Sequence, residues 1–193
     1  HKARQNQGDR KKDLKAYQTV YADEYGSIAA PTAGLHFTDE TLEKIKKKNI
    51  EILTVTLHVG IGTFEPIRVD DVTHHKMHEE TFHISNEVAK TIEDAKKTGR
   101  IVTAVGTTTV RTLEAAWHKD GFQTGWQKTS LFIYPPYQYS IPDQILTNFH
   151  LPQSTLLMLI CAFGGKDFIL DAYRKAVEEQ FRFFSFGDCM FIT

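Results

Sequence analysis

The sequence predicts a mixed α/β fold, with helical crossovers joining a largely parallel sheet or a barrel-like sheet. Short apolar strands alternate along the chain with amphipathic helical segments, which is the order expected for such sheets. Of the 193 residues, 41% are hydrophobic and 24% are charged, as in globular proteins with one sizeable core. Connecting segments between residues 17 and 193 are short, which favours a single α/β domain over that range.

The first 16 residues differ in composition and are predicted to form a charged arm or linker. They hold six lysines and arginines and two aspartates. Since the net charge of the whole chain is −1, a nucleic-acid partner would be bound through a local basic surface such as this arm. A solvated arm without a partner is the alternative interpretation.

Cysteine usage and hydropathy exclude two classes of protein. Cys161 and Cys189 are far apart and form no CxxC pair, so we expect a reducing cytoplasm and no disulfide scaffold. The longest apolar run, LLMLICAF, is too short to cross a bilayer and no signal peptide is visible, so we expect no membrane partner. The chain opens on His1 and not on methionine, which predicts that it is a piece of a longer protein.

In the first half of the chain, capping residues and apolar spacing predict two helices that each lead into a strand. Thr38 is the N-cap candidate of the first helix, and two acidic residues follow it in the first turn. Residues 53–59 then alternate apolar and polar side chains, as a strand requires. Ser85 is the N-cap candidate of a second helix that stops at Gly99, before a strand at 101–105.

The second half is predicted to continue the alternation of helices and strands. Its expected elements are a helix opened by the loop of GTTTVRTLEAAW at 106–117, a strand at 129–134, an apolar helix from Pro152 to Gly164 and Gly165, an amphipathic helix at 167–180, and a last strand within 181–193 with a kink at Gly187.

The stretch TLHVGIGTF places a histidine and two glycines where the first predicted strand ends. The alternation puts His58 on the polar face of the strand, at its carboxyl end. Gly60 and Gly62 allow the backbone a sharp turn or a close approach to a ligand. Since ligands gather at the carboxyl ends of strands in open α/β sheets, this end is a candidate binding site.

The stretch GTTTVR is a candidate anion site. Backbone amides at a helix N-terminus, hydroxyls that include those of Thr107 and Thr108, and the nearby Arg111 together suit a carboxylate or a phosphate. The spacing matches neither a Walker loop nor GxGxxG. A threonine-rich helix cap with a surface arginine explains the same residues without a ligand.

Titratable side chains gather in HHKMHEE. His74 and His78 lie four residues apart and could supply two metal ligands on a helix, but a third ligand is not evident, so we expect a loop or short strand and no metal site. His75, His78 and Glu80 are general acid or base candidates. Histidines that only hydrogen-bond the core are the alternative.

Further histidines and tyrosines stand among turn-forming residues. His36 follows Gly34, and His150 lies in TNFHLP, so α/β topology can bring both to one cleft, although each alone is more often structural. Tyr134 and Tyr137 flank two prolines and offer flat faces to a nucleobase, or simple packing.

Seven stretches in order resemble one known family. These are YQTVYA, GSIAAPTAGLHFT, TLHVGIGTFEPI, HKMHEE, AVGTTTVRTLE, LTNFHLPQSTLLML and FRFFSFGDCM. They are similar to the carboxy-terminal part of the S-adenosylmethionine:tRNA ribosyltransferase-isomerases, the queuosine-biosynthesis enzymes, over nearly everything from Tyr17 onward. The resemblance implies a cytoplasmic enzyme with a mixed α/β domain. It also implies that this chain lacks the family's amino-terminal part and small β-barrel insertion.

The resemblance implies a tRNA-modifying reaction. The ribosyl unit of S-adenosylmethionine is transferred and isomerised onto 7-aminomethyl-7-deazaguanine in the anticodon of a tRNA with a GUN anticodon, giving epoxyqueuosine, adenine and methionine. S-adenosylmethionine is then a consumed substrate, and no cofactor is expected. Two alternatives remain open, a non-catalytic tRNA-binding module and a metal-dependent hydrolase.

The reaction implied by the resemblance suggests a role for each motif. A base must act on the C–H beside the sulfonium and an acid on the departing adenine, and we expect both within one set of side chains: His36, His58, His78 and Glu80. An anionic group of substrate would occupy the Gly106 loop with Arg111 as its charged partner. The expected substrate-binding residues are Gly60, Gly62, Thr63, Gly106, Thr107, Thr108, Arg111, Tyr134, Tyr137, Asn148 and His150.

Overall fold

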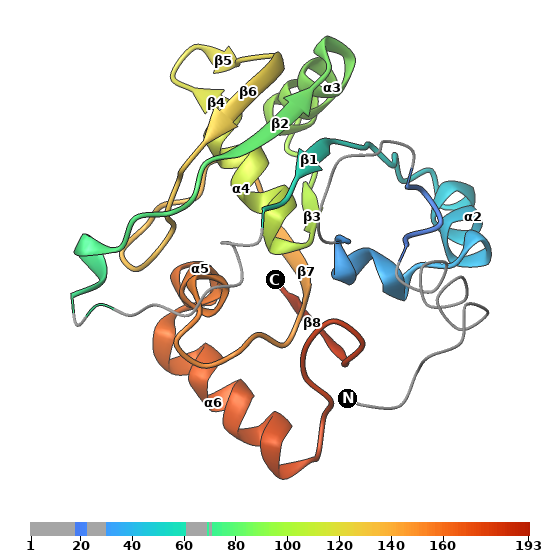
Figure 1. Cartoon of the computed structure of the whole chain (residues 1–193). Coiled ribbons are helices and arrows are strands. Elements are labelled where there is room, and N and C mark those ends of the chain that lie inside the picture. The colour runs from blue at the N-terminus through green and yellow to red at the C-terminus, as the bar shows by residue number, and fades with distance from the viewer. Residues whose placement is uncertain (1–17, 23–29, 61–68, 70) are drawn as a thin grey trace, which may run out of the picture.

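The computed structural model describes residues 18–22, 30–60, 69 and 71–193, and it has a mixed α/β architecture (Figure 1). The predicted arm at 1–16 lies outside these ranges. The described strands form three small sheets. These are β1 (Thr56–His58), β2 (Glu80–Ile84) and β6 (Gly125–Thr129) in the order β1-β2-β6; β3 (Thr103–Val105), β7 (Gln144–Asn148) and β8 (Cys189–Ile192) in the order β3-β7-β8; and the pair β4 (Trp117–His118) and β5 (Gly121–Phe122).

The predicted helices are present, and their local capping signals explain where they begin. The side chains of Thr38, Ser85 and Ser154 each accept a backbone hydrogen bond at the start of a helix. The helical elements are η1 (Thr32–His36), α2 (Asp39–Lys47), η3 (Val72–His74), α3 (Asn86–Lys97), α4 (Thr107–Ala116), α5 (Thr155–Gly164) and α6 (Lys166–Glu178).

The mixed α/β class is confirmed, but the expectation of a largely parallel sheet is wrong. Among the strands that the structure describes, β3 and β7 are the one parallel pair, and the other pairs are antiparallel. Antiparallel strands need no crossover helix. Accordingly, the described residues between β1 and β2 contain no helix longer than the three-residue η3. Only between β3 and β7 does α4 supply the predicted crossover.

Predicted strands are shorter in the structure than their apolar patterns. Of the segment 53–59, Thr56–His58 forms β1, and of the segment 101–105, Thr103–Val105 forms β3. The strand expected at 129–134 ends at Thr129, whose hydroxyl accepts a hydrogen bond from the amide of Leu131 at 3.0 Å. Ile133, from the same apolar run, is buried in the core without belonging to a strand. Its burial, and not strand pairing, therefore accounts for the apolar pattern there.

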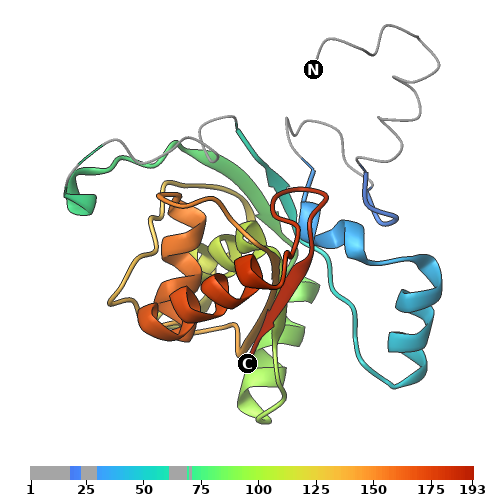
Figure 2. The same ribbon diagram turned by 90° about the horizontal axis from the view of Figure 1, so that it is seen from below.

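The core lies around α4, which packs against strands of both three-stranded sheets and against α5. Figures 1 and 2 show α4 between the sheets, α5 and α6 beside β7 and β8, and α2 standing apart from the rest. Val110 and Leu113 of α4 meet Phe82, Ile145 and Ile160 in one apolar cluster. No helix in the described part of the chain is long and apolar enough to span a membrane.

Candidate functional site

A pocket of about 240 Å³ lies where β3 and β7 end and where α4 and α5 begin. Because β3 and β7 are parallel, their carboxyl ends meet at one edge of the sheet, which is where ligands bind in α/β proteins. Among the described residues that line the pocket, none is Asp, Glu, Lys or Arg. Its polar lining includes Gly106, Thr107, Thr108, Asn148, His150 and Ser154.

The start of α4 lies at this pocket, and Gly106, Thr107 and Thr108 belong to its lining. Gly106 is the N-cap, with φ 90° and ψ 142°, and as a glycine it supplies no side-chain cap to the helix. The amide of Gly106 is used by the carbonyl of Leu146 at 2.8 Å, which ties the end of β3 to β7. The first amides of a helix have no partner within it, so those of Thr107 and Thr108 are suited to an anion.

Asn148, at the end of β7, connects the pocket to His36 of η1. The Nδ2 of Asn148 lies 3.2 Å from Nε2 of His36 and donates to the carbonyl oxygen of Phe184 at 3.1 Å. Since Nδ2 is a donor, Nε2 of His36 acts as the acceptor and the ring carries its proton on Nδ1. His36 is exposed and is not part of the pocket lining, which it contacts through Asn148.

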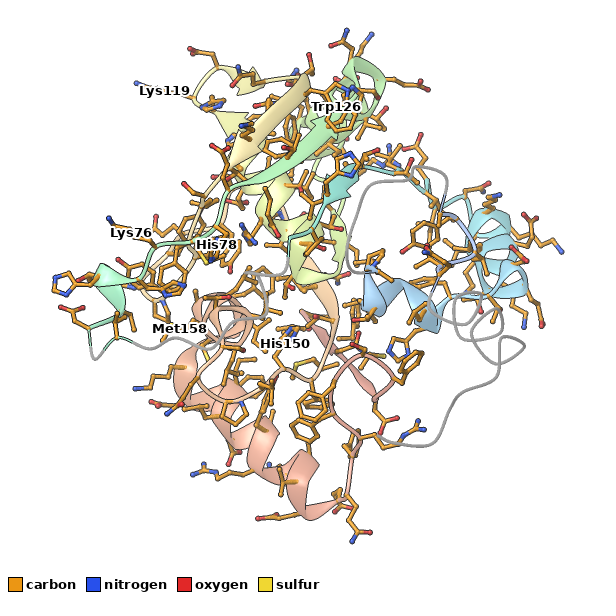
Figure 3. All side chains as sticks on the ribbon, viewed as in Figure 1. Lys76, His78, Lys119, Trp126, His150 and Met158 are labelled. Atoms are coloured by element: carbon orange, nitrogen blue, oxygen red, sulfur yellow. The ribbon has the colours of Figure 1, made fainter. Side chains whose placement is uncertain are left out.

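His150 is held neutral at the centre of the molecule, where Figure 3 labels it. Its Nε2 lies 3.0 Å from the hydroxyl of Thr147, and its backbone amide donates to the hydroxyl of Tyr173 at 2.8 Å. Burial lowers the pKa of His150 to about 4, because desolvation disfavours the charged imidazolium. His150 therefore contributes a neutral imidazole to the pocket near neutral pH.

This lowered pKa predicts a loss of stability in acid. The unfolded histidine takes a proton below about pH 6.5 and the folded one only near the lowered value, so the unfolded state binds more protons between them and stability falls as the pH falls. From about pH 7 to about pH 4.5, His150 should account for a loss of about 2–3 kcal/mol in the free energy of unfolding.

Urea unfolding of the wild type and of His150→Gln at both pH values measures this contribution. The glutamine variant should lose less stability on acidification, whereas His118→Gln, at an exposed histidine, should behave as the wild type. Equal acid sensitivity in the wild type and His150→Gln would contradict the prediction.

Arg111 was expected to be the charged partner of an anion in this pocket, but it does not belong to the pocket lining. Its Nη1 lies 2.8 Å from Oε2 of Glu80, and the two side chains are only 3% and 1% exposed. Its Nε donates to the carbonyl of Leu131 at 3.2 Å. Glu80 also accepts from the amide of Gly60 at 3.3 Å, so this pair braces the turn after β1.

His58 lies on the outer face of the antiparallel sheet, away from the pocket. Its ring stacks on Trp126, with centroids 5.3 Å apart and planes 4° apart, and His83 contacts the same indole at 5.1 Å. Figure 3 shows Trp126 on the upper sheet, well separated from His150. The alternation correctly placed His58 on the polar face of its strand, but that face looks away from the ends of the parallel strands.

The remaining histidine candidates are also outside the pocket lining. His78 is exposed in the segment before β2, and His75 contacts the ring of Phe132 edge-on. The described residues contain no group of three or more His, Cys, Asp or Glu side chains placed to hold a metal ion. Gly62 and Thr63 lie outside the described residues.

The two tyrosines proposed for base stacking are used in packing. The hydroxyl of Tyr137 donates to Oε2 of Glu114 at 2.9 Å, and burial together with this carboxylate raises the pKa of the tyrosine. Its ring packs on Tyr139, while Tyr134 contacts Phe132. Neither tyrosine lines the pocket.

Three further residues with defined roles were not anticipated from the sequence. Phe184 reaches the pocket from the turn before β8, and Ser154 caps α5 beside it. Glu114 is buried and accepts the amides of Ser140 and Ile141, which fixes the segment before β7. A polar residue on the apolar face of a predicted helix was the available signal for Glu114, whereas no local signal marks Phe184.

Comparisons of this chain with a family model and with curated proteins agree on one family. The family model described as "Queuosine biosynthesis protein" matches residues 3–192. S-adenosylmethionine:tRNA ribosyltransferase-isomerase from Thermotoga petrophila is 55% identical over 179 residues, which cover 93% of this chain and 53% of that protein. The protein of the same name from Treponema denticola is 56% identical over 186 residues, covering 95% of this chain and 54% of its own length.

A solved structure supports the same relationship. The crystal structure of S-adenosylmethionine tRNA ribosyltransferase from Thermotoga maritima matches with a TM-score of 0.70 and 46% identity, over 83% of this chain and 51% of that chain. The chain thus spans about half the length of the curated relatives it matches.

Proposed function

This chain belongs to the family of queuosine biosynthesis proteins, as its motifs predicted, and from that membership we propose its activity. It transfers and isomerises the ribosyl moiety of S-adenosylmethionine onto 7-aminomethyl-7-deazaguanine in a tRNA anticodon, and releases adenine and methionine. The tRNA carries a GUN anticodon, S-adenosylmethionine is consumed as a substrate, and the reaction takes place in the cytoplasm without a cofactor.

The observation that carries this proposal is the pocket at the ends of the parallel strands. It is concave, it joins the starts of two helices, and its lining combines apolar walls with a few convergent polar groups. These are the features of small-molecule sites. A substrate as polar as S-adenosylmethionine can be oriented there by backbone amides and neutral side chains.

Proton transfer in this site is best supplied by His36. Of the four acid–base candidates, His36 contacts Asn148, the polar residue at the end of β7, with Nε2 3.2 Å from Nδ2. Its solvent exposure allows proton exchange, and as a base it would take the proton beside the sulfonium on Nε2, in place of the hydrogen bond that this nitrogen accepts from Asn148. Glu80 acts instead as a positioning residue, because its carboxylate is committed to Arg111.

Neutral His150 suits the second requirement of the reaction, which is the departure of adenine. A neutral imidazole with one N–H can donate a hydrogen bond to the purine ring without carrying a buried charge. The lowered pKa of His150 keeps it in this form throughout the neutral range.

A product-release assay tests the proposal directly. The protein is incubated with S-adenosylmethionine and a tRNA carrying the 7-aminomethyl-7-deazaguanine base, and mass spectrometry follows adenine, methionine and epoxyqueuosine. All three should appear together, and His36→Ala should slow their release by about 100-fold or more, as expected for loss of a general base. His118→Ala, which removes an exposed histidine, is the matched control and should be as active as the wild type.

The assay includes a relative as the reference. If the Thermotoga petrophila protein forms all three products under conditions in which this chain forms none, the proposed activity of this chain is wrong. Full activity of His36→Ala would leave the reaction in place and remove His36 from it.

A further inference from the structure

We propose that the pocket recognises an α-amino-carboxylate group, with the carboxylate at the N-terminus of α4 and the ammonium group at Oδ1 of Asn148. The inference rests on the proposed function, because it assigns this pocket to the methionine end of S-adenosylmethionine. It goes beyond that function by naming the two ends of the subsite and the side chain that selects for the amine.

The orientation of the Asn148 amide is determined by its neighbours. The carbonyl oxygen of Phe184 can only accept a hydrogen bond, so the atom 3.1 Å from it is the NH₂ group of Asn148. The same NH₂ group contacts Nε2 of His36. The opposite atom, Oδ1, is therefore the oxygen of the amide.

Oδ1 of Asn148 is a buried acceptor without a hydrogen-bond partner among the residues that the structure describes. The side chain belongs to a residue that is only 3% exposed, and this residue lines the pocket. Buried polar atoms are nearly always paired, so an orphaned acceptor beside a pocket points to a ligand that donates a hydrogen bond.

The other end of the subsite favours negative charge. The amides of Thr107 and Thr108 lie in the first turn of α4, which has no side-chain cap. The positive end of the helix dipole adds to the attraction, and no acidic side chain of the described lining opposes it. A carboxylate is therefore stabilised at this end of the pocket.

The two ends are close together because β3 and β7 are neighbouring parallel strands. Val105 pairs with Leu146, so Gly106 and Asn148 follow this pair at the same edge of the sheet. Adjacent strands lie about 4.8 Å apart, which matches a ligand whose anion and amine share one carbon atom. A phosphodiester lacks the donor that Oδ1 needs, and an amine alone would meet the positive end of α4.

The electrical neutrality of the pocket agrees with this ligand. His150 is neutral near pH 7, and the described lining has no Asp, Glu, Lys or Arg side chain. A zwitterion has no net charge, but its ammonium and its carboxylate each need hydrogen-bond partners. Such a pocket suits a zwitterion better than a group of one charge, because no formal charge is buried without its counterpart.

Ligand binding by the wild-type chain gives the first test. Isothermal titration calorimetry compares S-adenosylhomocysteine, its decarboxylated analogue, and 5′-deoxy-5′-methylthioadenosine, which lacks the whole amino-acid end. S-adenosylhomocysteine should bind at least about tenfold more tightly than either of the others, as expected for hydrogen bonds to charged groups. Equal affinities, no binding of any of them, or displacement of S-adenosylhomocysteine by inorganic phosphate would overturn the proposal.

The variant Asn148→Ala gives the second test. It should weaken the binding of S-adenosylhomocysteine by about tenfold or more and leave the affinity for 5′-deoxy-5′-methylthioadenosine unchanged. Gln144→Ala removes an amide from the opposite end of the same strand and should leave both affinities unchanged. An unchanged affinity for S-adenosylhomocysteine in Asn148→Ala would overturn the assignment. Should that variant fail to fold, the wild-type ligand series decides the question.

The experiments can contradict the proposed subsite and the proposed activity independently of each other. Products released by the wild type, together with an insensitive Asn148→Ala, keep the activity and remove the subsite. Selective binding of S-adenosylhomocysteine without product release keeps the subsite and removes the activity.

Discussion

Replacing Arg111 by methionine should lower the free energy of unfolding by about 3–5 kcal/mol, because it leaves the carboxylate of Glu80 buried without its counter-charge. The two side chains are nearly inaccessible and lie 2.8 Å apart. Burial lowers the pKa of Arg111, and the nearby Glu80 partly offsets this effect, so each charge depends on the other. Urea unfolding at neutral pH measures the loss.

A matched ion pair on the neighbouring strand provides the control. Lys128 lies 2.7 Å from Glu79, but these side chains are 64% and 58% exposed. Lys128→Met should therefore cost less than about 1 kcal/mol. The double variant Arg111→Met, Glu80→Leu should recover part of the stability, since it removes the stranded charge. A loss below about 1 kcal/mol in Arg111→Met alone would show that the buried pair is not required.

In the proposed reaction, replacing Gly106 by alanine should raise the KM for S-adenosylmethionine by about tenfold or more, through displacement of the first turn of α4. Gly106 has φ 90°, a conformation that an L-residue adopts at a cost of about 1–3 kcal/mol. A Cβ there would meet Ala33 and Thr108 at 3.7 Å, and both residues line the pocket. The added methyl group and the strain therefore act at the ligand site.

Gly165 is a close structural match for Gly106 outside the pocket. It caps α6 with φ 85° and ψ 131°, and a Cβ there would meet no atom within 4 Å. Gly165→Ala should cost similar stability and leave the KM unchanged. Thermal unfolding and steady-state kinetics of both variants separate the two effects. Equal KM values in both variants would exclude a role for the Gly106 turn in substrate binding.

Local signals were enough to predict most helices. Thr38 and Ser85 cap the two helices for which they were predicted as N-caps. Such caps can be predicted from sequence because the side chain bonds to an amide only a few residues away. The apolar helix before Gly165 and the amphipathic helix after it were also predicted. Strand pairing was predicted poorly, since the partner of β2 on one side is β6, more than 40 residues further along the chain.

Part of the candidate site followed from the sequence in the same way. Gly106 was expected at the start of a helix, and Asn148 and His150 were expected to bind substrate; the structure brings all three to one pocket because β3 and β7 run parallel. His58 was expected at the carboxyl end of a strand, but its strand pairs antiparallel to β2 and presents it to Trp126. Similar local sequence patterns thus lie in different parts of the structure, because one strand pairs in parallel and the other antiparallel.

The sequence by itself determined the family, the mixed α/β class, the caps of the helices and the residues that open α4, because these depend on covalent order and on contacts within a few residues. Only the tertiary structure decided that Arg111 pairs with Glu80, and that Oδ1 of Asn148 is buried without a hydrogen-bond partner among the described residues. Both outcomes depend on which groups lose water together when distant segments pack, and desolvation of a charge or an amide is a property of the assembled core.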